Sequence, residues 1–421
     1  MDKNHPNLGQ FMKPVSLLAL LPLCIAYHVQ AAALERSGQS TLAFLEPNNY
    51  TEFNIGVITG NLSGENSNKQ ELSQALNVTD FSTGNLLEDF HFIQSAIKLQ
   101  LNPQISVGLL FDQPFGIKLD YDYSPESILG NEQLEAINIH LKSQNITGLI
   151  GYQPTPRWNI YGGLAYQNFS GDLYLFGQSF YFFNGYNISL KNDPALGWLG
   201  GISYQIPEIA LKANLTYRSK IKHNNQSIEY TPNDGVVNSH TEIVTPQSVN
   251  FDFMSGVSTH NLVYGSLRWV NWSSFKMKPK GFDQIIQNTI TDFKALPSTP
   301  EISDFIQSLS NFNLIDYQSD QWSAKIGIAH QVNDRTFVSL EALWDSGSDN
   351  PASTINPANG YNGLGTGLRY QFTPKSFIAG GVYYLKFKPS QENKNSISVS
   401  SISTLDDRTA WAYGLKIGHY F

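Results

Sequence analysis

The feature that most limits the fold of this chain is an alternation of apolar and polar side chains with a period of two residues. This period is typical of β-strands with one apolar and one polar face. The alternating segments come in pairs joined by tight turns, with a single segment at each end of the series. The sequence therefore predicts about fourteen strands. We place them at residues 51–61, 89–101, 105–111, 136–152, 158–174, 196–206, 209–222, 248–253, 262–272, 321–332, 336–344, 361–372, 376–387 and 410–421.

The connections between these segments alternate regularly in length. Short turns join the two members of each pair, and long segments separate one pair from the next. Short turns at one end and long loops at the other are the pattern of an outer-membrane β-barrel. A soluble β-sandwich has no reason to keep the two lengths in phase. The long segments are residues 62–88, 124–135, 175–195, 223–247, 273–320, 345–360 and 388–409.

The composition excludes several other classes of protein. Charged residues make up 15% of the chain, against roughly 25% in soluble domains. Aromatic residues make up 13%, yet hydrophobic residues reach only 41% and the mean hydropathy is -0.25. A helical membrane protein needs several long apolar runs, which this chain lacks. The net charge of -8 argues against a nucleic-acid partner.

Residues 1–33 have the pattern of a secretory signal peptide. Lys13 precedes an apolar stretch at residues 17–27, and alanines follow at residues 31–33. This order of basic, apolar and small residues is typical of a cleaved signal. The stretch is too short to span a bilayer. Translation that starts at Met12 instead of Met1 leaves the same signal peptide. The alternative interpretation of this segment is a buried N-terminal helix.

The only cysteine, Cys24, lies inside this apolar stretch. Cleavage near residues 31–33 removes it, and Leu23 before it is too large for a lipoprotein signal. The mature chain then has no thiol, which excludes disulfide bonds and thiolate metal sites. We expect neither a metal nor a cofactor.

The last expected strand ends in an aromatic residue. Tyr413, Leu415, Ile417, His419 and Phe421 share one of its faces. Barrels of the bacterial outer membrane present such a strand to their assembly machinery, which we expect as a partner. Pairing of this strand with the first one would close the barrel and leave no free edge.

Three segments resemble strands of one known family. Residues 215–222, with the sequence LTYRSKIK, resemble the L-T-Y-R-S strand motif of the long-chain fatty acid transporter (FadL) family. Residues 266–275 resemble that family's strand ending in W-S-x-F, and residues 410–421 are similar to its closing strand. The three segments occur in the family's order.

This resemblance implies an all-β fold, a transmembrane antiparallel barrel of about fourteen strands in the bacterial outer membrane. It implies uptake of hydrophobic compounds, chiefly long-chain fatty acids and in some branches aromatic hydrocarbons. The family carries an N-terminal hatch with an Asn-Pro-Ala motif, which the segment 47–49 matches poorly. We therefore expect residues 34–50 to form a short plug-like segment and residues 51–421 to form the barrel.

Two of the long connections, residues 175–195 and 273–320, are rich in apolar residues. On extracellular loops such residues need a packing partner, because they would otherwise form exposed apolar patches. Residues 282–293 and 300–309 have helical spacing, and Ser298 or Thr299 can cap the second helix. In the family, two such loops meet in a groove that captures ligand; the alternative is a cover over the barrel mouth. The candidate ligand-binding residues are Phe176, Phe180, Phe182, Phe183, Ile286 and Phe305.

A break interrupts the third strand at residues 112–116. Pro114 cannot donate to a ladder, and Gly116 adds no side chain to it. The resemblance implies an inward kink here that opens a lateral path into the outer leaflet, with Pro114, Phe115 and Gly116 at the kink. An ordinary bulge is the alternative.

The inferred inner face is basic although the whole chain is acidic. A fatty carboxylate needs a cationic partner inside a low-dielectric tunnel. We select Arg218, Arg268 and Lys220 as candidates, because all three lie in the family-like segments. The alternative is a network of ion pairs that stiffens the barrel. The basic residues assigned to this face are Lys118, Lys212, Arg218, Lys220, Lys222, Arg268, Lys325, Arg369 and Lys416.

An enzymatic function finds no support in the sequence, because G-x-S-x-G and H-E-x-x-H motifs are both missing. The sequence predicts a transporter whose partners are a hydrophobic small molecule, outer-membrane lipid and the assembly machinery, and which is a monomer. A hydrocarbon channel of the same family and a general diffusion porin are the alternatives.

Overall fold

The structure is a computed structural model. It describes residues 34–66, 85, 88–120, 137–176, 178–317, 319–347, 360–388 and 402–421. The expected signal peptide, residues 1–33, lies outside these residues and stays a prediction. Among the described residues, no helix is long and apolar enough to cross a membrane.

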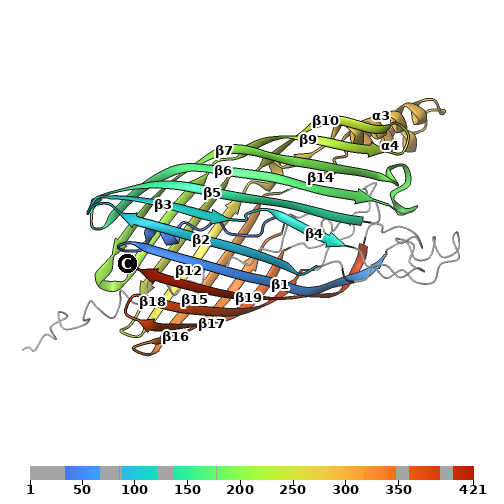
Figure 1. The fold of residues 1–421 in the computed structure, drawn as a ribbon. Coiled ribbons are helices and arrows are strands. Elements are labelled where there is room, and N and C mark those ends of the chain that lie inside the picture. The colour runs from blue at the N-terminus through green and yellow to red at the C-terminus, as the bar shows by residue number, and fades with distance from the viewer. Residues whose placement is uncertain are drawn as a thin grey trace, which may run out of the picture.

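The strands form one closed antiparallel barrel (Figure 1). The first strand, β1 (Tyr50–Asn66), pairs with the last, β19 (Ile402–Tyr420), from Tyr50 opposite Tyr420 to Asn66 opposite Ile402. Its other edge pairs with β2. The predicted closure between the first and the last strand is therefore confirmed.

The sheet contains seventeen strands in the described residues. Three of the barrel's wall strands are interrupted, as β3 with β4, β8 with β9 and β10 with β11, so the wall has the predicted fourteen. The remaining bounds are β2 (Phe90–Gln100), β3 (Ile105–Asp112), β4 (Gly116–Asp120), β5 (Ile137–Thr155), β6 (Trp158–Leu175), β7 (Tyr186–Ile206), β8 (Leu211–Arg218), β9 (Ile221–Thr231), β10 (Gly235–Thr245), β11 (Ser248–Gly256), β12 (Asn261–Val270), β15 (Gln321–Asn333), β16 (Thr336–Asp345), β17 (Tyr361–Thr373) and β18 (Ser376–Phe387).

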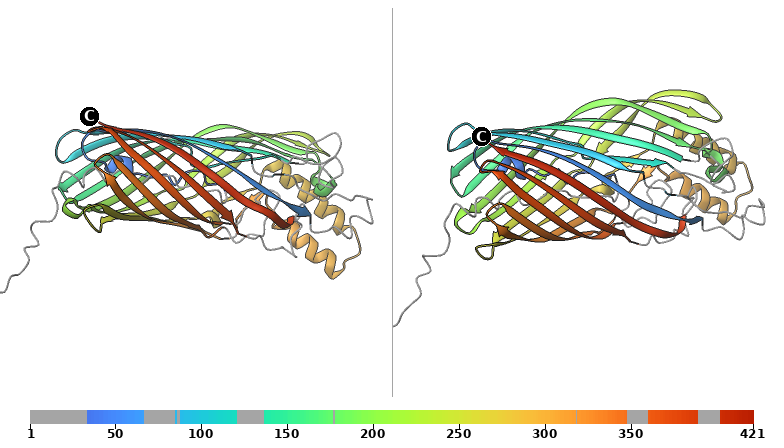
Figure 2. Two further views of the ribbon diagram at one scale, coloured as in Figure 1. Left: turned by 90° about the horizontal axis from the view of Figure 1, so that it is seen from below. Right: turned by 60° about the horizontal axis from the view of Figure 1, so that its bottom comes forward.

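The short turns and the C-terminus gather at one end of the barrel, and the helical connection after β12 lies at the other (Figures 1 and 2). The long connection after β12 carries the helices α3 (Lys280–Lys294) and α4 (Pro300–Ser310) and the short strands β13 (Lys276–Met277) and β14 (Ile315–Asp316). The Thr299 hydroxyl accepts a hydrogen bond from the Ile302 N–H at 3.3 Å, which caps α4 as predicted. The remaining helices are the 3₁₀ turns η3 (Leu42–Leu45), η4 (Gln178–Phe183), η5 (Pro207–Ile209) and η6 (Trp272–Ser274).

Two segments expected to be loops are largely strand, so those bounds were wrong. β7 already begins at Tyr186, and residues 223–247 contain most of the hairpin of β9 and β10. The inward side chains of β9, from His223 to Thr231, are polar yet completely buried. Lys222, Asn224 and Gln226 on its outward face are polar too, so alternation marks only the end of this strand, at Ile228 and Tyr230.

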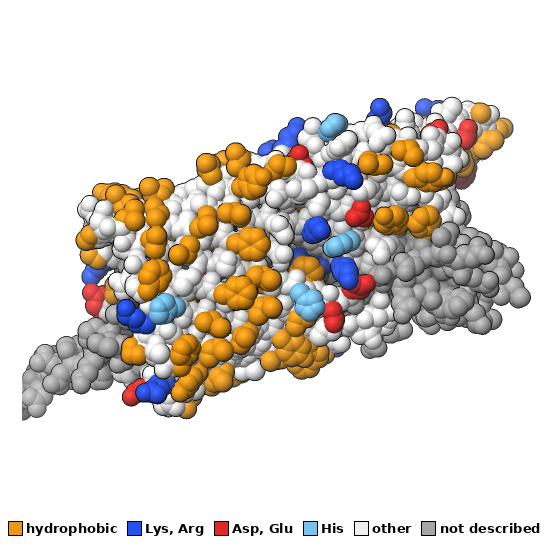
Figure 3. Space-filling view, viewed as in Figure 1, with side chains coloured by type: hydrophobic (Ala, Val, Ile, Leu, Met, Phe, Trp, Pro, Cys, Tyr) orange, Lys and Arg blue, Asp and Glu red, His pale blue; other side chains and the backbone are white. Residues whose placement is uncertain are grey.

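The outside of the barrel carries many exposed apolar side chains. They spread over the wall in Figure 3, from the short-turn end toward the loops. Examples are Ile150, Leu164, Leu196, Leu340, Leu364 and Trp411, each of which is more than 40% exposed. A monomer in water rarely exposes so much contiguous apolar surface. This surface fits the hydrocarbon layer of a membrane.

Candidate functional site

Residues 34–49, here called the plug segment, run inside the barrel and contact the inner faces of several strands (Figures 1 and 2). The Asn250 side chain donates to the Gly38 carbonyl at 2.7 Å, and the Lys212 ammonium donates to the Leu45 carbonyl at 2.9 Å. The Thr41 hydroxyl lies 2.9 Å from the hydroxyl of Tyr161. These bonds hold a short irregular segment in place without secondary structure of its own beyond η3.

The break in the third strand lies where the plug segment meets the wall. The Pro114 carbonyl accepts from the Arg36 N–H at 2.7 Å, and the Gly116 N–H donates to the Leu34 carbonyl at 2.7 Å. The Phe115 side chain is buried and its ring packs edge-on against Trp272 at a centroid distance of 5.6 Å. The plug segment thus takes up backbone groups that a continuous strand would offer to its neighbour.

The break also changes which side chains face inward. Asp112 pairs with Asn145 and Gly116 pairs with Lys142, so three residues of the break oppose two residues of β5. One extra residue on one strand is a bulge, and it inverts the faces beyond it. Lys118 is therefore exposed and forms an ion pair with Glu88. Its assignment to the lumen face was wrong.

The bulge is accompanied by a gap in the wall. β2 pairs with β3 only from Gln100 to Ser95, and β4 pairs with β5. In the described residues, no ladder joins residues 90–94 of β2 to β4. The sequence left two interpretations of this break, an opening in the wall and an ordinary bulge. Both features occur together, because the bulge lies at the edge of an unpaired stretch of wall.

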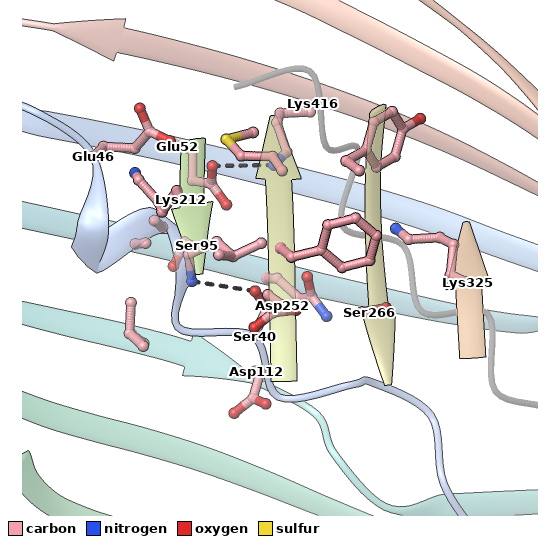
Figure 4. A pocket seen from close by; sticks show the side chains of 18 of the residues that line it. Ser40, Glu46, Glu52, Ser95, Asp112, Lys212, Asp252, Ser266, Lys325 and Lys416 are labelled. Carbon is pink, nitrogen blue, oxygen red and sulfur yellow. Dashed lines mark hydrogen bonds and ion pairs between the residues drawn. The ribbon is translucent and has the colours of Figure 1, made fainter. Parts of the chain in front are cut away.

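A cavity, here called the lumen cavity, lies between the plug segment and the strands of the wall (Figure 4). It has about 1010 Å³ of space free of protein atoms, part of which is open to solvent. The cavity reaches β2 and β3 beside the break, at residues 94–96 and 110–112. It is thus adjacent to the gap in the wall.

The lumen cavity is lined by charges of both signs. The Lys416 ammonium lies 3.1 Å from Glu52, and the Asp252 carboxylate accepts from the Asn214 amide at 3.2 Å. The Lys325 ammonium lies 3.7 Å from Glu341, outside the cavity. The cations that line the cavity are Lys212, Arg218, Lys325 and Lys416, and the acids are Glu46, Glu52, Asp112 and Asp252.

Arg268, one of the two arginines selected from the sequence, has no unused donor. Its Nε and one terminal nitrogen both contact the Glu35 carboxylate, and the Nε distance is 2.7 Å. The same terminal nitrogen also donates to the Gln39 side chain, and the other donates to Ser248 and Asn250. Five donors are all that a guanidinium has. While the plug segment is in place, all donors of Arg268 are used within the protein. Arg268 therefore fits the alternative interpretation, an ion-pair network that stiffens the barrel.

Arg218 differs, because it lines the lumen cavity and retains unused donors. One terminal nitrogen donates to the Gln39 carbonyl at 2.9 Å. Its Nε is buried and has no hydrogen-bond partner among the residues that the structure describes. Buried donors normally find a partner, so an orphaned guanidinium N–H beside a cavity indicates where an acceptor could bind.

Lys220, the third cation selected from the sequence, is exposed, whereas Ile221, His223 and Asn225 are buried. The inward residues are even-numbered up to Arg218 and odd-numbered from Ile221 onward. The interruption between β8 and β9 therefore inverts the faces, as at the other break. The expectation that Lys220 and Lys222 face the lumen was wrong.

The loop residues selected from the sequence largely come together. Phe180, Phe183 and Ile286 are buried in one apolar cluster, against which Phe182 and Phe305 pack. The ring of Phe183 stacks on that of Phe282 at 4.4 Å. Phe176 instead stacks on the exposed Tyr174 at 6.3 Å, apart from that cluster. The cluster joins η4 to α3 and α4, which is compatible with either the groove or the cover.

The plug residues Glu35 and Arg36 were missed by the sequence reasoning. They occupy a segment without alternation, and their partners lie on strands far along the chain. Glu229 of β9, whose buried carboxylate accepts from the Phe282 N–H of α3 at 3.0 Å, was missed because its strand was expected to be a loop. No pattern within a few residues could have identified the three side chains as parts of the site.

Comparison with solved structures gives the fold. The chain is similar to a FadL homologue of Pseudomonas aeruginosa, with a TM-score of 0.60, 13% identity and coverage of 90% of this chain and 92% of the other. It is also similar to the toluene transporter TbuX of Ralstonia pickettii, with a TM-score of 0.57, 11% identity and coverage of 98% of each chain. For the toluene transporter TodX of P. putida, the TM-score is 0.59 and the identity is 13%, with coverage of 90% of this chain and 92% of the other.

At the level of sequence, no curated protein matches the chain. Residues 41–421 match the family described as outer membrane protein transport protein (OMPP1/FadL/TodX). This match spans the barrel and most of the plug segment. The chain therefore belongs to this family of non-enzymatic outer-membrane channels for hydrophobic compounds.

Proposed function

We propose that the protein takes up long-chain fatty acids, by capture at the loop cluster, binding in the lumen cavity and lateral exit through the gap beside β4. The observation that carries the proposal is the adjacency of the cavity to the gap. Residues 94–96 and 110–112 line the cavity and also border the stretch where β2 and β4 are unpaired.

The cations of the cavity favour a ligand with an acidic head. Four cationic and four acidic side chains line the cavity, so a charged head group would find partners there, whereas a neutral hydrocarbon would find apolar walls more favourable. A carboxylate could accept hydrogen bonds from the unused donors of Arg218. Arg218 is therefore the proposed head-group residue, and Arg268 holds the plug segment.

Capture is proposed at the apolar cluster of η4, α3 and α4. Phe182 and Phe305 are only partly buried and pack at its edge, so they are the residues that a ligand could reach first. An alkyl chain that replaces water on these rings gains roughly 25 cal/mol for each Å² of apolar surface it covers.

Lateral exit is favoured over passage along the barrel axis because the plug segment lies across part of the lumen near the short turns. Leu45 and Phe44 are buried there, and Lys212 is bonded to the Leu45 carbonyl. A hydrophobic ligand that leaves through the wall enters lipid directly and avoids water.

A monoaromatic hydrocarbon is the second candidate ligand. Phe183, Phe282 and Phe312 form a stack of rings, with Phe312 5.7 Å from Phe183. Such rings would also receive a small aromatic guest by stacking. The charged lumen cavity does not favour this ligand over an amphiphile.

Uptake assays separate these functions. Cells that carry this protein as their only transporter for hydrophobic compounds are given labelled oleate, oleyl alcohol or toluene, and cells without the protein are the control. We expect protein-dependent uptake of oleate that exceeds that of toluene. Uptake of toluene alone would support the second candidate. In vesicles, sugar-driven swelling above that of empty vesicles would instead indicate a diffusion porin.

A further inference from the structure

The two edges of the gap are joined by side chains where a ladder is missing. The Gln113 side-chain carbonyl accepts from the Ile93 N–H of β2 at 3.1 Å. Glu88, just before β2, forms an ion pair with Lys118 of β4. In a membrane, every lipid-exposed backbone group needs a partner, so an unpaired edge has to be covered.

Arg36 forms a third bridge and comes from the plug segment. Its Nε donates to the carbonyl of Gly116, the first residue of β4, at 2.5 Å. The centre of its guanidinium lies 4.2 Å from the ring centroid of Phe90, the first residue of β2. One side chain therefore contacts both edges of the gap, through a hydrogen bond on one side and a cation–π contact on the other.

The guanidinium of Arg36 has no acidic partner among the described residues. Its side chain is only 4% exposed, and its single side-chain hydrogen bond there is the one to Gly116. Buried cations are normally paired with an acid. Asp112 is the acid of the break. Its carboxylate accepts hydrogen bonds from the Ser37 hydroxyl at 3.0 Å and from the Asn145 amide at 3.0 Å.

We infer that Arg36 is the latch of the lateral gap and that a ligand carboxylate releases it. The four terminal N–H groups of its guanidinium can bind a carboxylate in a bidentate manner. Such a bond is stronger than the contact with the Phe90 ring, so the anionic head draws Arg36 away from β2. A neutral ligand offers no comparable acceptor. Arg36 thereby makes the exit selective for anionic amphiphiles. This inference rests on the proposed lateral exit.

The test compares oleate with oleyl alcohol, which has the same chain but a neutral head. Uptake of both is measured in cells with the parent protein or with Arg36→Gln, Arg36→Lys or Phe90→Leu. Heat-modifiable mobility in gels verifies the amount of folded barrel. We expect Arg36→Gln to lower the ratio of oleate to alcohol uptake by about tenfold. Arg36→Lys keeps the charge and should retain most of the preference.

Arg369→Gln is the matched control. Arg369 is also a buried arginine over an aromatic ring, 4.0 Å from the centroid of Phe377, but it lies on β17, away from the gap. This variant should leave the ratio unchanged. An equal effect of Arg36→Gln and Arg369→Gln on the ratio, or none from Arg36→Gln, would overturn the inference.

Phe90→Leu separates the latch from head-group recognition and is decisive if Arg36→Gln fails to fold. It removes one contact of the latch but leaves the cation, so uptake of both ligands should rise by a similar factor. Unchanged uptake would show that the contact does not restrain the gap. If the parent takes up neither ligand, the proposed function fails and the inference falls with it. If the parent takes up oleate, only the inference is at stake.

Discussion

Glu35 and Arg268 form an ion pair that is sealed from solvent, although 233 residues separate them in the chain. Glu35 is 0% exposed and Arg268 is 1% exposed. The pair fastens the start of the plug segment to β12. Because Arg36 follows Glu35 directly, the same anchor fixes the position of the residue that bridges the gap.

Removal of one partner of this pair should release the plug segment. Arg268→Met leaves the Glu35 carboxylate buried without its cation, which costs about 3–5 kcal/mol in comparable buried pairs. We expect faster protease cleavage within the plug segment and a lower free energy of unfolding. The double variant Glu35→Leu with Arg268→Met removes both charges and should recover part of the loss. Equal protease protection in the single variant and the parent would contradict the anchor.

Arg218 should bind the head group of the ligand. Arg218→Met removes its charge and its unused donors, so the affinity for oleate should fall by about tenfold or more. Affinity for oleyl alcohol should change little. Lys220→Met is the matched control, because Lys220 is exposed. Titration of the purified barrel with each ligand measures both affinities. Equal losses for the two ligands would point to structural damage.

The barrel itself could be predicted from the sequence because its rules are local. Alternation along each strand places one face in lipid, and the lengths of the connections distinguish the two ends. Leu211, Leu215 and Tyr217 face outward and Lys212 faces inward, as the pattern of β8 predicted. The same holds for the helical spacing of α3 and the cap at Thr299.

The site could be predicted only in part, because two breaks invert the faces of their strands. Lys118 lies just beyond one break and Lys220 lies within the other, and an unbroken period of two puts both on the wrong side. Pro114 and Gly116 marked one break in the sequence. At the other break, β9 resumes with polar side chains on both faces from Lys222 to Ser227. The contacts of Glu35 and Arg36 follow from the folded plug segment, which no periodicity encodes.

Glu229 should hold helix α3 against the wall. Its buried carboxylate accepts from the Phe282 N–H at 3.0 Å and from the Tyr186 hydroxyl at 2.9 Å. Pro279, the N-cap residue of α3, offers no side-chain cap, so this carboxylate fulfils that role from β9. Glu229→Ala leaves two buried donors unpaired, at about 1–3 kcal/mol for each.

We expect Glu229→Ala to accelerate hydrogen exchange and proteolysis in α3 and α4, with the barrel still folded. Asp283→Ala is the control on the same helix. It breaks the pair with Lys278, whose atoms lie 2.9 Å apart and where Asp283 is 42% exposed. A surface pair of this kind contributes about 1 kcal/mol or less. Similar protection of α3 in Glu229→Ala and the parent would rule out the docking role.

Phe421 should be needed for efficient assembly. Its side chain is 46% exposed on the outer surface, and its N–H donates to the Asn49 carbonyl at 3.2 Å. Deletion of Phe421 removes the exposed aromatic residue that follows β19 but no buried side chain of the core. We therefore expect less protein in the outer membrane, while the barrel that does assemble keeps its heat-modifiable mobility. Phe421→Tyr should restore the yield, and an unchanged yield after deletion would contradict this role.

Asp320 should make the segment after β12, residues 271–275, sensitive to acid. Burial alone would raise the pKa of this carboxyl, but hydrogen bonds from Ser273, Asn271 and Trp269 outweigh it and hold the pKa below its usual range. A depressed pKa in the folded state stabilises the segment fully above the unfolded value of about 4, and this stability is lost as the pH falls through the folded value. Hydrogen exchange of residues 271–275 should therefore increase between neutral pH and about pH 3, after correction for the intrinsic rates. Asp320→Asn should exchange faster at neutral pH and show little further change in acid. A parent-like acid response in that variant would assign the effect to another group.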